Sequence, residues 1–295
     1  MAWVSGTCVG HVALLDALKT FLTSNTTLVE AEQNWLVLAD VSTDTREVYF
    51  KGVGFSGTDE IFIGFKVFDD STADTHNVAV AGFTGYREGI PFFSQPGAGS
   101  LYMTLTDQSI TYWFIADGRR VIIIARVGGV YMTAYLGFFL PYTNPSAYPY
   151  PLCVGANALS ATQRFSEQNT NNFNFFNPLN ADKSTLKYMY GGLWRDVYYS
   201  APVSTIGTKS GYLLHQVMTN GLPLTLNPDG VSRYMTPLDI VCDLGFIGRL
   251  DGIMVTTGYG AVAEDTLTPP DGSTWLMIPN VYRSDVSRFA AILLA

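Results

Sequence analysis

The sequence predicts a mainly β fold, made of β-sandwich-like antiparallel sheets, with one amphipathic helix near the N-terminus. The composition is the first observation: 17 Tyr, 18 Phe and 28 Gly, with only 14% charged residues, favour pleated surfaces joined by tight turns. The second is rhythm, because short apolar runs alternate with turn-forming clusters at intervals of roughly ten residues. The third is that helical spacing of apolar residues is clear at one place, near the start.

The helix is expected over residues 10–24. Apolar positions recur there at spacings of three and four and form one stripe: His11, Leu14, Leu15, Leu18 and Leu22, widened by Val12 and Phe21. Ser5 or Thr7 is expected to cap its start, and the polar run 24–27 to end it. We expect the apolar face to dock on a sheet or on a neighbouring subunit. Residues 1–30 are therefore interpreted as an N-terminal helix and attachment segment.

Residues 31–157 are expected to form a first β-rich region. Its early strands are expected at residues 35–39, 46–53, 60–68 and 77–82, before an ordered loop over 86–100 that contains Pro91 and Pro96. A three-strand meander follows over residues 109–116, 120–127 and 130–140, with turns at Asp117-Gly118 and Gly128-Gly129. The stretch 121–140 is apolar except for Arg126, but its central Gly pair favours a hairpin over a membrane helix. We predict no transmembrane segment.

Residues 158–190 are interpreted as an Asn/Phe-rich loop or arm. The stretch from Asn169 to Asn177 shows neither strand nor helix periodicity, and its aromatic side chains, Phe173, Phe175 and Phe176, favour a buried interface arm. Residues 191–295 are expected to form a second β-rich region, packed with the first as one domain. Its strands are expected over 193–199, 211–218, 230–235 and in a final group within 240–293.

Charge and cysteine content restrict the partners and the compartment. The net charge of −8, from 25 acidic and 17 basic residues without a block of like charge, gives no footprint for nucleic acid. Few charges with 47% hydrophobic residues indicate that other protein covers part of the surface, as in a homo-oligomer. Cys8, Cys153 and Cys242 are odd in number and are interpreted as reduced. With no secretory signal visible, we expect folding in a reducing cytoplasm.

Motifs for catalysis or for metal and cofactor binding are not found. His11, His76 and His215 stand in unrelated contexts, and no H-x-x-x-H, C-x-x-C, nucleophile elbow or phosphate-binding loop occurs. His11 is interpreted as a core or interface residue. Asp69, Asp70 and Asp74 suggest a calcium site but lack the twelve-residue loop. We predict no cofactor, no metal and no catalytic residue.

Two kinds of residue leave alternatives open. Exposed aromatic rings bind sugars and also anchor protein interfaces, and the candidates for either role are Tyr142, Tyr148, Tyr150 and Trp194. Glycoside hydrolysis needs two carboxyl groups across a cleft. Sequence spacing brings no pair together among the candidates, which are Glu60, Asp69, Asp70, Glu88, Asp196 and Asp251.

Several strings resemble a family of tailed-bacteriophage virion proteins. The first is the run 113–120, which continues through Ala134-Tyr135-Leu136-Gly137-Phe138 to Pro141-Tyr142 and the run 148–152. Towards the end, the similar strings are Leu250-Asp251-Gly252, the run 258–265 and Asn280-Val281-Tyr282-Arg283. The helix over residues 10–24 is a further match.

The resemblance implies a structural component of a tailed-phage virion, in its tail, baseplate or neck. Such a protein acts without catalysis, through interfaces with its own copies and with other virion proteins. It folds in the host cytoplasm before assembly. A receptor- or glycan-binding module at the tail tip, in contact with host surface glycan, is the first alternative. A polysaccharide-degrading virion enzyme is the second.

Overall fold

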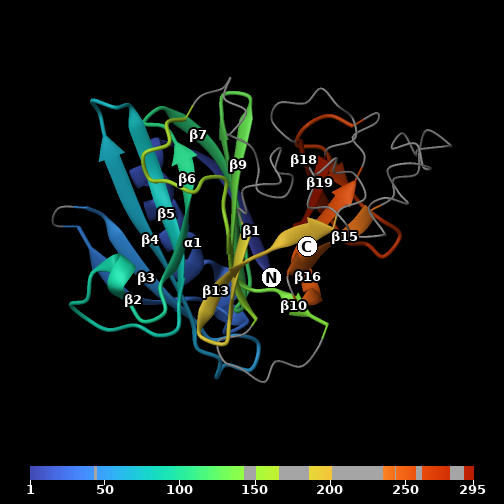
Figure 1. The fold of residues 1–295 in the computed structure, drawn as a ribbon. Helices are drawn as coiled ribbons and strands as arrows, with labels where there is room; N and C mark the ends of the chain where they lie inside the picture. The colour runs from blue at the N-terminus through green and yellow to red at the C-terminus, as the bar shows by residue number, and fades with distance from the viewer. Residues whose placement is uncertain are drawn as a thin grey trace.

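The structure, a computed structural model, describes residues 1–42, 45–142, 151–165, 186–200, 235–242, 244–256, 261–279 and 289–295. Three antiparallel sheets stack in layers (Figure 1). We call them the helix-side sheet, the central sheet and the C-terminal sheet. The predicted fold class is confirmed: the chain is mainly β and carries a helical segment near its N-terminus.

The central sheet has seven strands. In spatial order they are β1 (Ala2–Val9), β7 (Ser109–Ala116), β8 (Arg120–Val127), β9 (Val130–Phe138), β11 (Leu152–Gly155), β12 (Leu186–Tyr190) and β13 (Leu193–Asp196). The predicted meander is β7, β8 and β9. Val127 pairs with Val130 across the Gly pair, and Gly128 takes φ 59°, the left-handed conformation that tight hairpins need. In the described part of the chain, no helix is long and apolar enough to cross a membrane.

Strand β1 was not predicted, and it changes how the helix begins. It pairs antiparallel with β7, from Ala2 opposite Ala116 to Val9 opposite Ser109. Helix α1 (Gly10–Ser24) follows without a linker, and Gly10 makes the turn with φ 80°. The expected caps at Ser5 and Thr7 are therefore wrong, because both residues lie inside the strand, and the actual N-cap residue makes no side-chain cap bond. A short helix, α2 (Thr26–Glu30), begins after Asn25.

The helix-side sheet contains the predicted early strands and one more. Its order is β2 (Leu36–Val41), β3 (Glu47–Gly52), β4 (Ile61–Asp70), β5 (Thr75–Phe83) and β6 (Gly99–Leu105). The loop expected over 86–100 contains the short 3-10 helix η1 (Phe92–Ser94), but it ends two residues earlier than predicted, because β6 begins at Gly99. Strand β6 was missed because no strand was expected between the end of this loop and residue 109.

The C-terminal sheet runs in the order β14 (Tyr198–Ser200), β15 (Met235–Cys242), β16 (Gly245–Thr256), β19 (Phe289–Leu293), β18 (Trp275–Pro279) and β17 (Thr266–Leu267). Strand β10 (Leu140–Pro141) leaves the end of β9 and pairs with β16, which joins this sheet to the central one. The predicted strand 193–199 is divided between β13 and β14, in different sheets. The predicted boundary at residue 191 falls in the β12–β13 turn.

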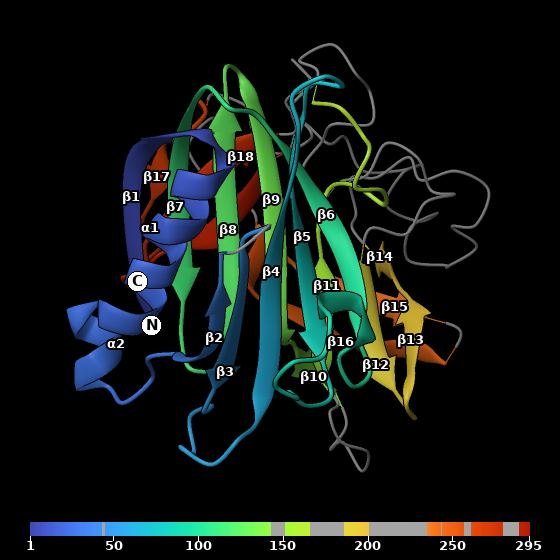
Figure 2. The same ribbon diagram turned by 90° about the vertical axis from the view of Figure 1, so that its left-hand side faces the viewer.

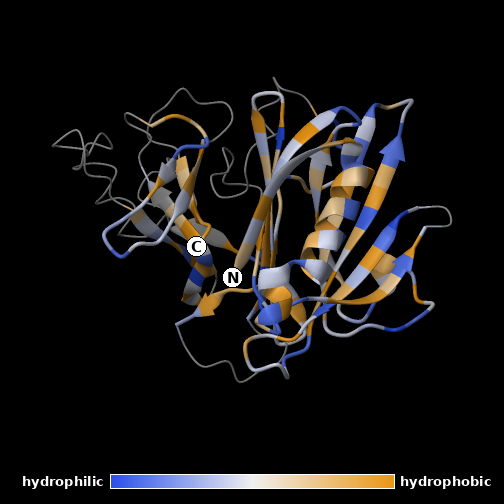
Figure 3. Ribbon diagram, turned by 180° about the vertical axis from the view of Figure 1, so that it is seen from behind, coloured by the Kyte–Doolittle hydropathy of each residue, from blue (hydrophilic) through white to orange (hydrophobic). Residues whose placement is uncertain are grey.

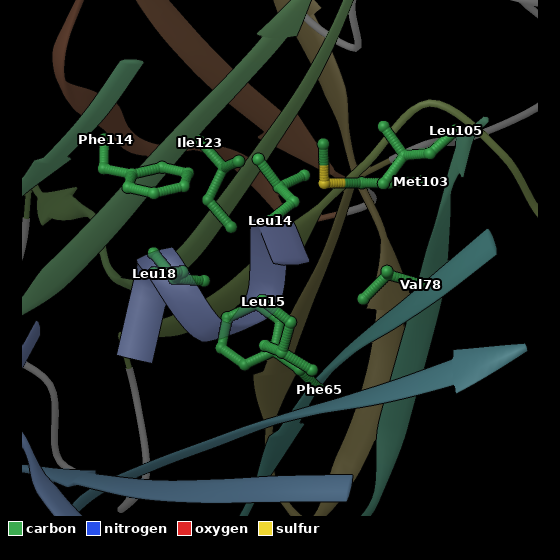
Figure 4. Close-up of a pocket in the computed structure, with 9 residues that line it drawn as sticks. All are labelled: Leu14, Leu15, Leu18, Phe65, Val78, Met103, Leu105, Phe114 and Ile123. Atoms are coloured by element: carbon green, nitrogen blue, oxygen red, sulfur yellow. The ribbon is translucent and has the colours of Figure 1, made fainter. Parts of the chain in front are cut away.

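Helix α1 packs in the space between the central and helix-side sheets, alongside β1 and β7 (Figure 2). Its buried face matches the predicted stripe, with the exception of Val12, which is 43% exposed. Figure 3 shows the helix as alternating hydrophobic and hydrophilic bands, as expected for a helix with one buried face. The expected docking of this face on a sheet is thus seen within the chain itself. A small apolar cavity lies beneath it, lined by α1 and by strands of both sheets (Figure 4).

Candidate functional sites

Of the predicted aromatic contact residues, Tyr142 and Trp194 are described. Tyr142 is 52% exposed, and its hydroxyl donates a hydrogen bond to Asp239 on β15. Partial burial, with the hydrogen bond and the charge of Asp239, raises the pKa of Tyr142 to about 12. Its ring is accessible beside the C-terminal sheet. Tyr148, Tyr150, Phe173, Phe175 and Phe176 lie outside the described residues.

Trp194, on the edge strand β13, is packed rather than free. Its indole N–H donates to the carbonyl of Gly97 at 2.8 Å. The ring covers Gly82 and Gly99 so closely that a Cβ at either position would collide with it. Trp194 and Tyr142 therefore contact different parts of the molecule, and the described residues do not join them into one stacking platform.

The turn between β7 and β8 forms an ion-pair joint with the C-terminal sheet. Arg120 is 1% exposed, and its Nε lies 2.9 Å from Asp251 Oδ2 on β16 and 3.6 Å from Asp117 Oδ2. Asp117 Oδ1 accepts the backbone N–H groups of Arg119 and Arg120. The Arg120 guanidinium lies where a Cβ of residue 252 would project, so Gly252 permits its close approach.

A second polar contact joins the same two sheets. Arg126, at the far end of β8, pairs with Glu264, and the hydroxyl of Tyr131 donates to the same carboxylate at 2.7 Å. Burial, followed by the bond to Glu264, raises the pKa of Tyr131 to about 12. The backbone N–H of Glu264 donates to Met277 on β18. The Glu264 carboxylate thus binds side chains of the central sheet, while the backbone of Glu264 pairs with the C-terminal sheet.

These joints contain part of the strings that carry the family resemblance; residues 148–150, 258–260 and 280–283 lie outside the described residues. The run 113–120 ends in the turn that holds Arg120, while Asp251 and Gly252 belong to the second string and Glu264 to the third. Phe138, in the continuation of the first string, donates its N–H to the carbonyl of Arg119 at 2.9 Å. Segments far apart in the sequence therefore meet at contacts inside the chain, and these contacts are structural.

A histidine cluster lies where α1 begins. His11 and His76 are 3% and 6% exposed, and their ring centroids are 5.4 Å apart. The Nδ1–H of His76 donates to Asp69 Oδ1 at 2.7 Å. Ligand atoms of His11, His76 and Asp69 all lie within 4.8 Å of one another. Burial lowers the pKa of His11, which favours the neutral ring.

The sequence reasoning missed this cluster because its residues share no local motif. His11 lies in the first turn of α1, and the other two residues lie on opposite sides of the β4–β5 hairpin, where Asp69 pairs with His76. The suggested calcium set is divided, because Asp70 accepts the backbone N–H groups of Thr72 and Ala73 and Asp74 pairs with Arg164. The visible signal was one histidine within an otherwise apolar helix stripe.

Exposed apolar side chains collect on the N-terminal segments. We call them the N-terminal flank: Trp3, Val9, Val12, Val29, Leu36, Val37 and Val41. They lie on β1, α1, α2 and β2, which share one side of the molecule (Figure 2). Strands β1 and β2 are edge strands of the central and helix-side sheets. The flank therefore combines apolar side chains with strand edges that have no described partner on one side.

The candidate carboxylates for glycoside hydrolysis mostly have other partners. Asp251 pairs with Arg119 and Arg120, Glu60 with Lys51, and Asp69 with His76.

No protein-family model matches the chain, and no curated protein matches it either. The resemblance to tailed-phage virion proteins thus stays a prediction.

Proposed function

We propose that the chain is a structural subunit of a tailed-phage virion, in the tail, baseplate or neck, and that it acts through protein interfaces. The N-terminal flank is the observation that carries this proposal. Exposed Trp and aliphatic side chains on edge strands offer both apolar area and unpaired backbone groups to a partner. Aromatic contacts that lose water at an interface would contribute most of the association energy.

The edge strands make the flank more than a scatter of apolar residues. Soluble proteins usually protect such edges with Lys, Pro or a covering segment. Strand β1 instead presents Trp3 and Val9, which are 43% and 73% exposed, on the face opposite its core side. Strand β2 presents Leu36 and Val41 at its two ends. A second copy of the chain, or another virion protein, would cover these side chains by adding a strand.

The ion-pair joint supports the same proposal from the interior. Some charged residues of the strings that resemble virion proteins, among them Arg120, Asp251 and Glu264, lie in contacts between sheets of this chain, and Arg120 is buried. The resemblance is thus carried by residues that hold the fold together. That pattern supports an architecture shared with virion proteins and does not require a shared reaction.

The proposal is tested by replacing two flank residues, Trp3→Lys with Leu36→Lys. Light scattering on the purified protein should show that the wild type forms oligomers and the variant is a monomer of unchanged circular dichroism. Val262→Lys is the matched control, because Val262 is 69% exposed but lies outside the flank. A strict monomer at high concentration, together with absence from purified particles by mass spectrometry, would refute the proposal.

One observation keeps the glycan-binding alternative. The exposed ring of Tyr142 lies beside β16 of the C-terminal sheet, because its backbone N–H donates to the carbonyl of Ile247, and the neighbouring Phe246 is 41% exposed. Exposed rings beside a carboxylate, here Asp239, suit sugar stacking with hydrogen bonding. Glycan-array binding that Tyr142→Ala abolishes would favour this alternative. Phe55→Ala, which also removes an exposed ring, should leave such binding intact.

A further inference from the structure

Three separate segments bring polar side chains together at the start of α1. His11 comes from the first helical turn, His76 and Asp69 from the β4–β5 hairpin, and Asp107 from the loop before β7. Gly10 fixes the helix to that loop, because its N–H donates to the carbonyl of Gln108 at 2.8 Å. The cluster thus connects the helix to both sheets that it packs between.

The unpaired nitrogens of His11 are the first sign of a binding site. Both ring nitrogens are buried, and neither has a hydrogen-bond partner. Buried polar atoms are nearly always paired, so each exception requires a reason. Here the ring lies beside a carboxylate and a second imidazole, which are groups that bind cations.

The surroundings of His76 give a second, independent sign. Its Nδ1 lies 2.7 Å from Asp69 Oδ1, and the opposite edge of the ring presents Nε2. That atom lies 3.4 Å from Asp74 Oδ1 and 4.0 Å from Asp107 Oδ2. Carboxylates thus face both edges of the ring, and this gathering of negative charge favours positive charge at the same place.

Basic side chains do not supply that charge. Among the described residues, Arg164 pairs with Asp74, but no Lys or Arg pairs with Asp69 or Asp107. The positive end of the α1 dipole is disfavourable for a cation but amounts to only about half a charge. The two carboxylates that no Lys or Arg of the described residues pairs with, Asp69 and Asp107, outweigh it.

From this geometry we propose that His11, His76 and Asp69 form a binding site for one divalent transition-metal ion, with Asp107 adding negative charge. Two imidazole nitrogens and a carboxylate oxygen are a donor set typical of zinc and of neighbouring ions such as cobalt and nickel. Calcium and magnesium prefer oxygen donors and should bind poorly. The ligand atoms, at most 4.8 Å apart, must move closer, and the Asp69 side chain, 57% exposed, is free to do so.

The bound ion would act as a clamp. It would tie the start of α1 to the β4–β5 hairpin and so hold the helix between its two sheets. The exposed carboxylates give it an entry path from solvent, while the buried rings restrain its ligands. The site does not depend on the role proposed in a virus particle.

Zinc titration of the full chain tests the site. The protein is purified without a histidine tag, stripped with a chelator and titrated with zinc chloride by calorimetry. We expect saturable one-to-one binding and a rise in melting temperature, because an ion that binds only the folded state stabilises it. Cobalt(II) should give the visible absorption band of a site with a low coordination number and nitrogen and oxygen ligands. Magnesium should not bind.

Two variants and a matched control assign the ligands. Asp69→Asn should weaken zinc binding by more than about tenfold. His11→Leu should abolish the zinc-dependent rise in melting temperature while leaving the metal-free protein at least as stable, since the unpaired nitrogens are gone. Asp70→Asn removes a neighbouring carboxylate, but its amide oxygen can still accept the turn N–H groups, so binding should not change. Absence of binding by the wild type, or equal binding by Asp69→Asn, would overturn the proposal; the latter decides the matter even if His11→Leu does not fold.

Discussion

The two faces of the central sheet are built differently although they share the same strands. Along β8, Val121, Ile123 and Ala125 face the helix-side sheet and join an apolar cluster. The alternate residues face the C-terminal sheet, with Arg120 at one end and Arg126 at the other, each paired with a carboxylate of that sheet's side. One face is a packed core, and the other is a core bordered by ion pairs.

This difference teaches what each kind of contact contributes. Apolar packing stabilises the fold but accepts many partners of similar shape. A buried ion pair contributes little net stability, yet removing one partner is costly because it leaves a buried charge. We therefore infer that the helix-side face supplies most of the stability and that the ion pairs determine how the C-terminal sheet docks.

The largest effect is expected from Arg120→Met, which removes a buried ion pair from the face of the central sheet that meets the C-terminal sheet. It leaves Asp117, 3% exposed, without its buried cation and should lower the free energy of unfolding by about 3–5 kcal/mol. Hydrogen exchange should accelerate most in β16 and β19. Arg119→Met is the matched control: Arg119 pairs with the same Asp251 but is 27% exposed, so its cost should be below about 1 kcal/mol. Equal costs for the two variants would contradict the assignment.

Leu18→Ala tests the apolar side and should cost about 3 kcal/mol. Leu18 is 2% exposed and lines the cavity between α1 and the two sheets (Figure 4), so truncation enlarges an existing void. Urea unfolding measures the change. Val12→Ala, on the exposed side of the same helix, should change stability by less than about 0.5 kcal/mol. If Leu18→Ala opened β16 and β19 before α1, the two faces would not be energetically distinct.

The same difference explains how much of the fold could be predicted. The meander was predictable with its boundaries at β7 and β8, because Asp117-Gly118 and Gly128-Gly129 are local turn signals between apolar strands. Helix α1 was predictable from spacing alone. Strand β1 was not predictable, because its sequence shows no clear alternation of apolar and polar residues. The face that packs on the core carries Val4, Gly6 and Cys8. Its pairing with β7 is a long-range contact.

The candidate sites depend on such long-range contacts, so sequence patterns could not locate them. Arg120 and Asp251, or His11 and His76, become neighbours only when the sheets stack and α1 docks. Trp194 was predicted to be an exposed ring for sugar or interface contact, but its packing on Gly99 depends on where the β12–β13 hairpin lies. Local spacing determines elements, and the docking of elements determines sites.

Gly99→Ala extends the comparison to the far edge of the helix-side face. A methyl group there would enter the space of the Trp194 ring and should cost about 1–3 kcal/mol. Faster hydrogen exchange in β13 would report the displaced ring. Gly129→Ala is the control, because a Cβ at that turn position meets nothing within 4 Å. A neutral Gly99→Ala would mean that Trp194 moves without penalty.

The smallest effect is expected from Tyr131→Phe, on the same face of the central sheet as the ion pairs. The effect of this substitution on stability should depend on pH. The variant loses the 2.7 Å bond to Glu264 and should cost about 1 kcal/mol near neutral pH. The pKa of Tyr131 is raised to about 12 in the folded protein, against about 10 in an unfolded chain. Its contribution is thus fully present below pH 10 and is lost as the pH rises towards 12, because the unfolded state releases the proton first.

The difference between wild type and Tyr131→Phe should therefore shrink between pH 10 and pH 12, and urea unfolding at pH 8 and at pH 11 measures it. Other tyrosines titrate in both proteins and cancel in the difference. A difference that stayed constant over this range would show that Glu264 and burial do not hold the proton on Tyr131. The contact between the central sheet and Glu264 would then depend on Arg126 alone. Arg126→Met would in that case abolish the contact that Tyr131→Phe leaves intact.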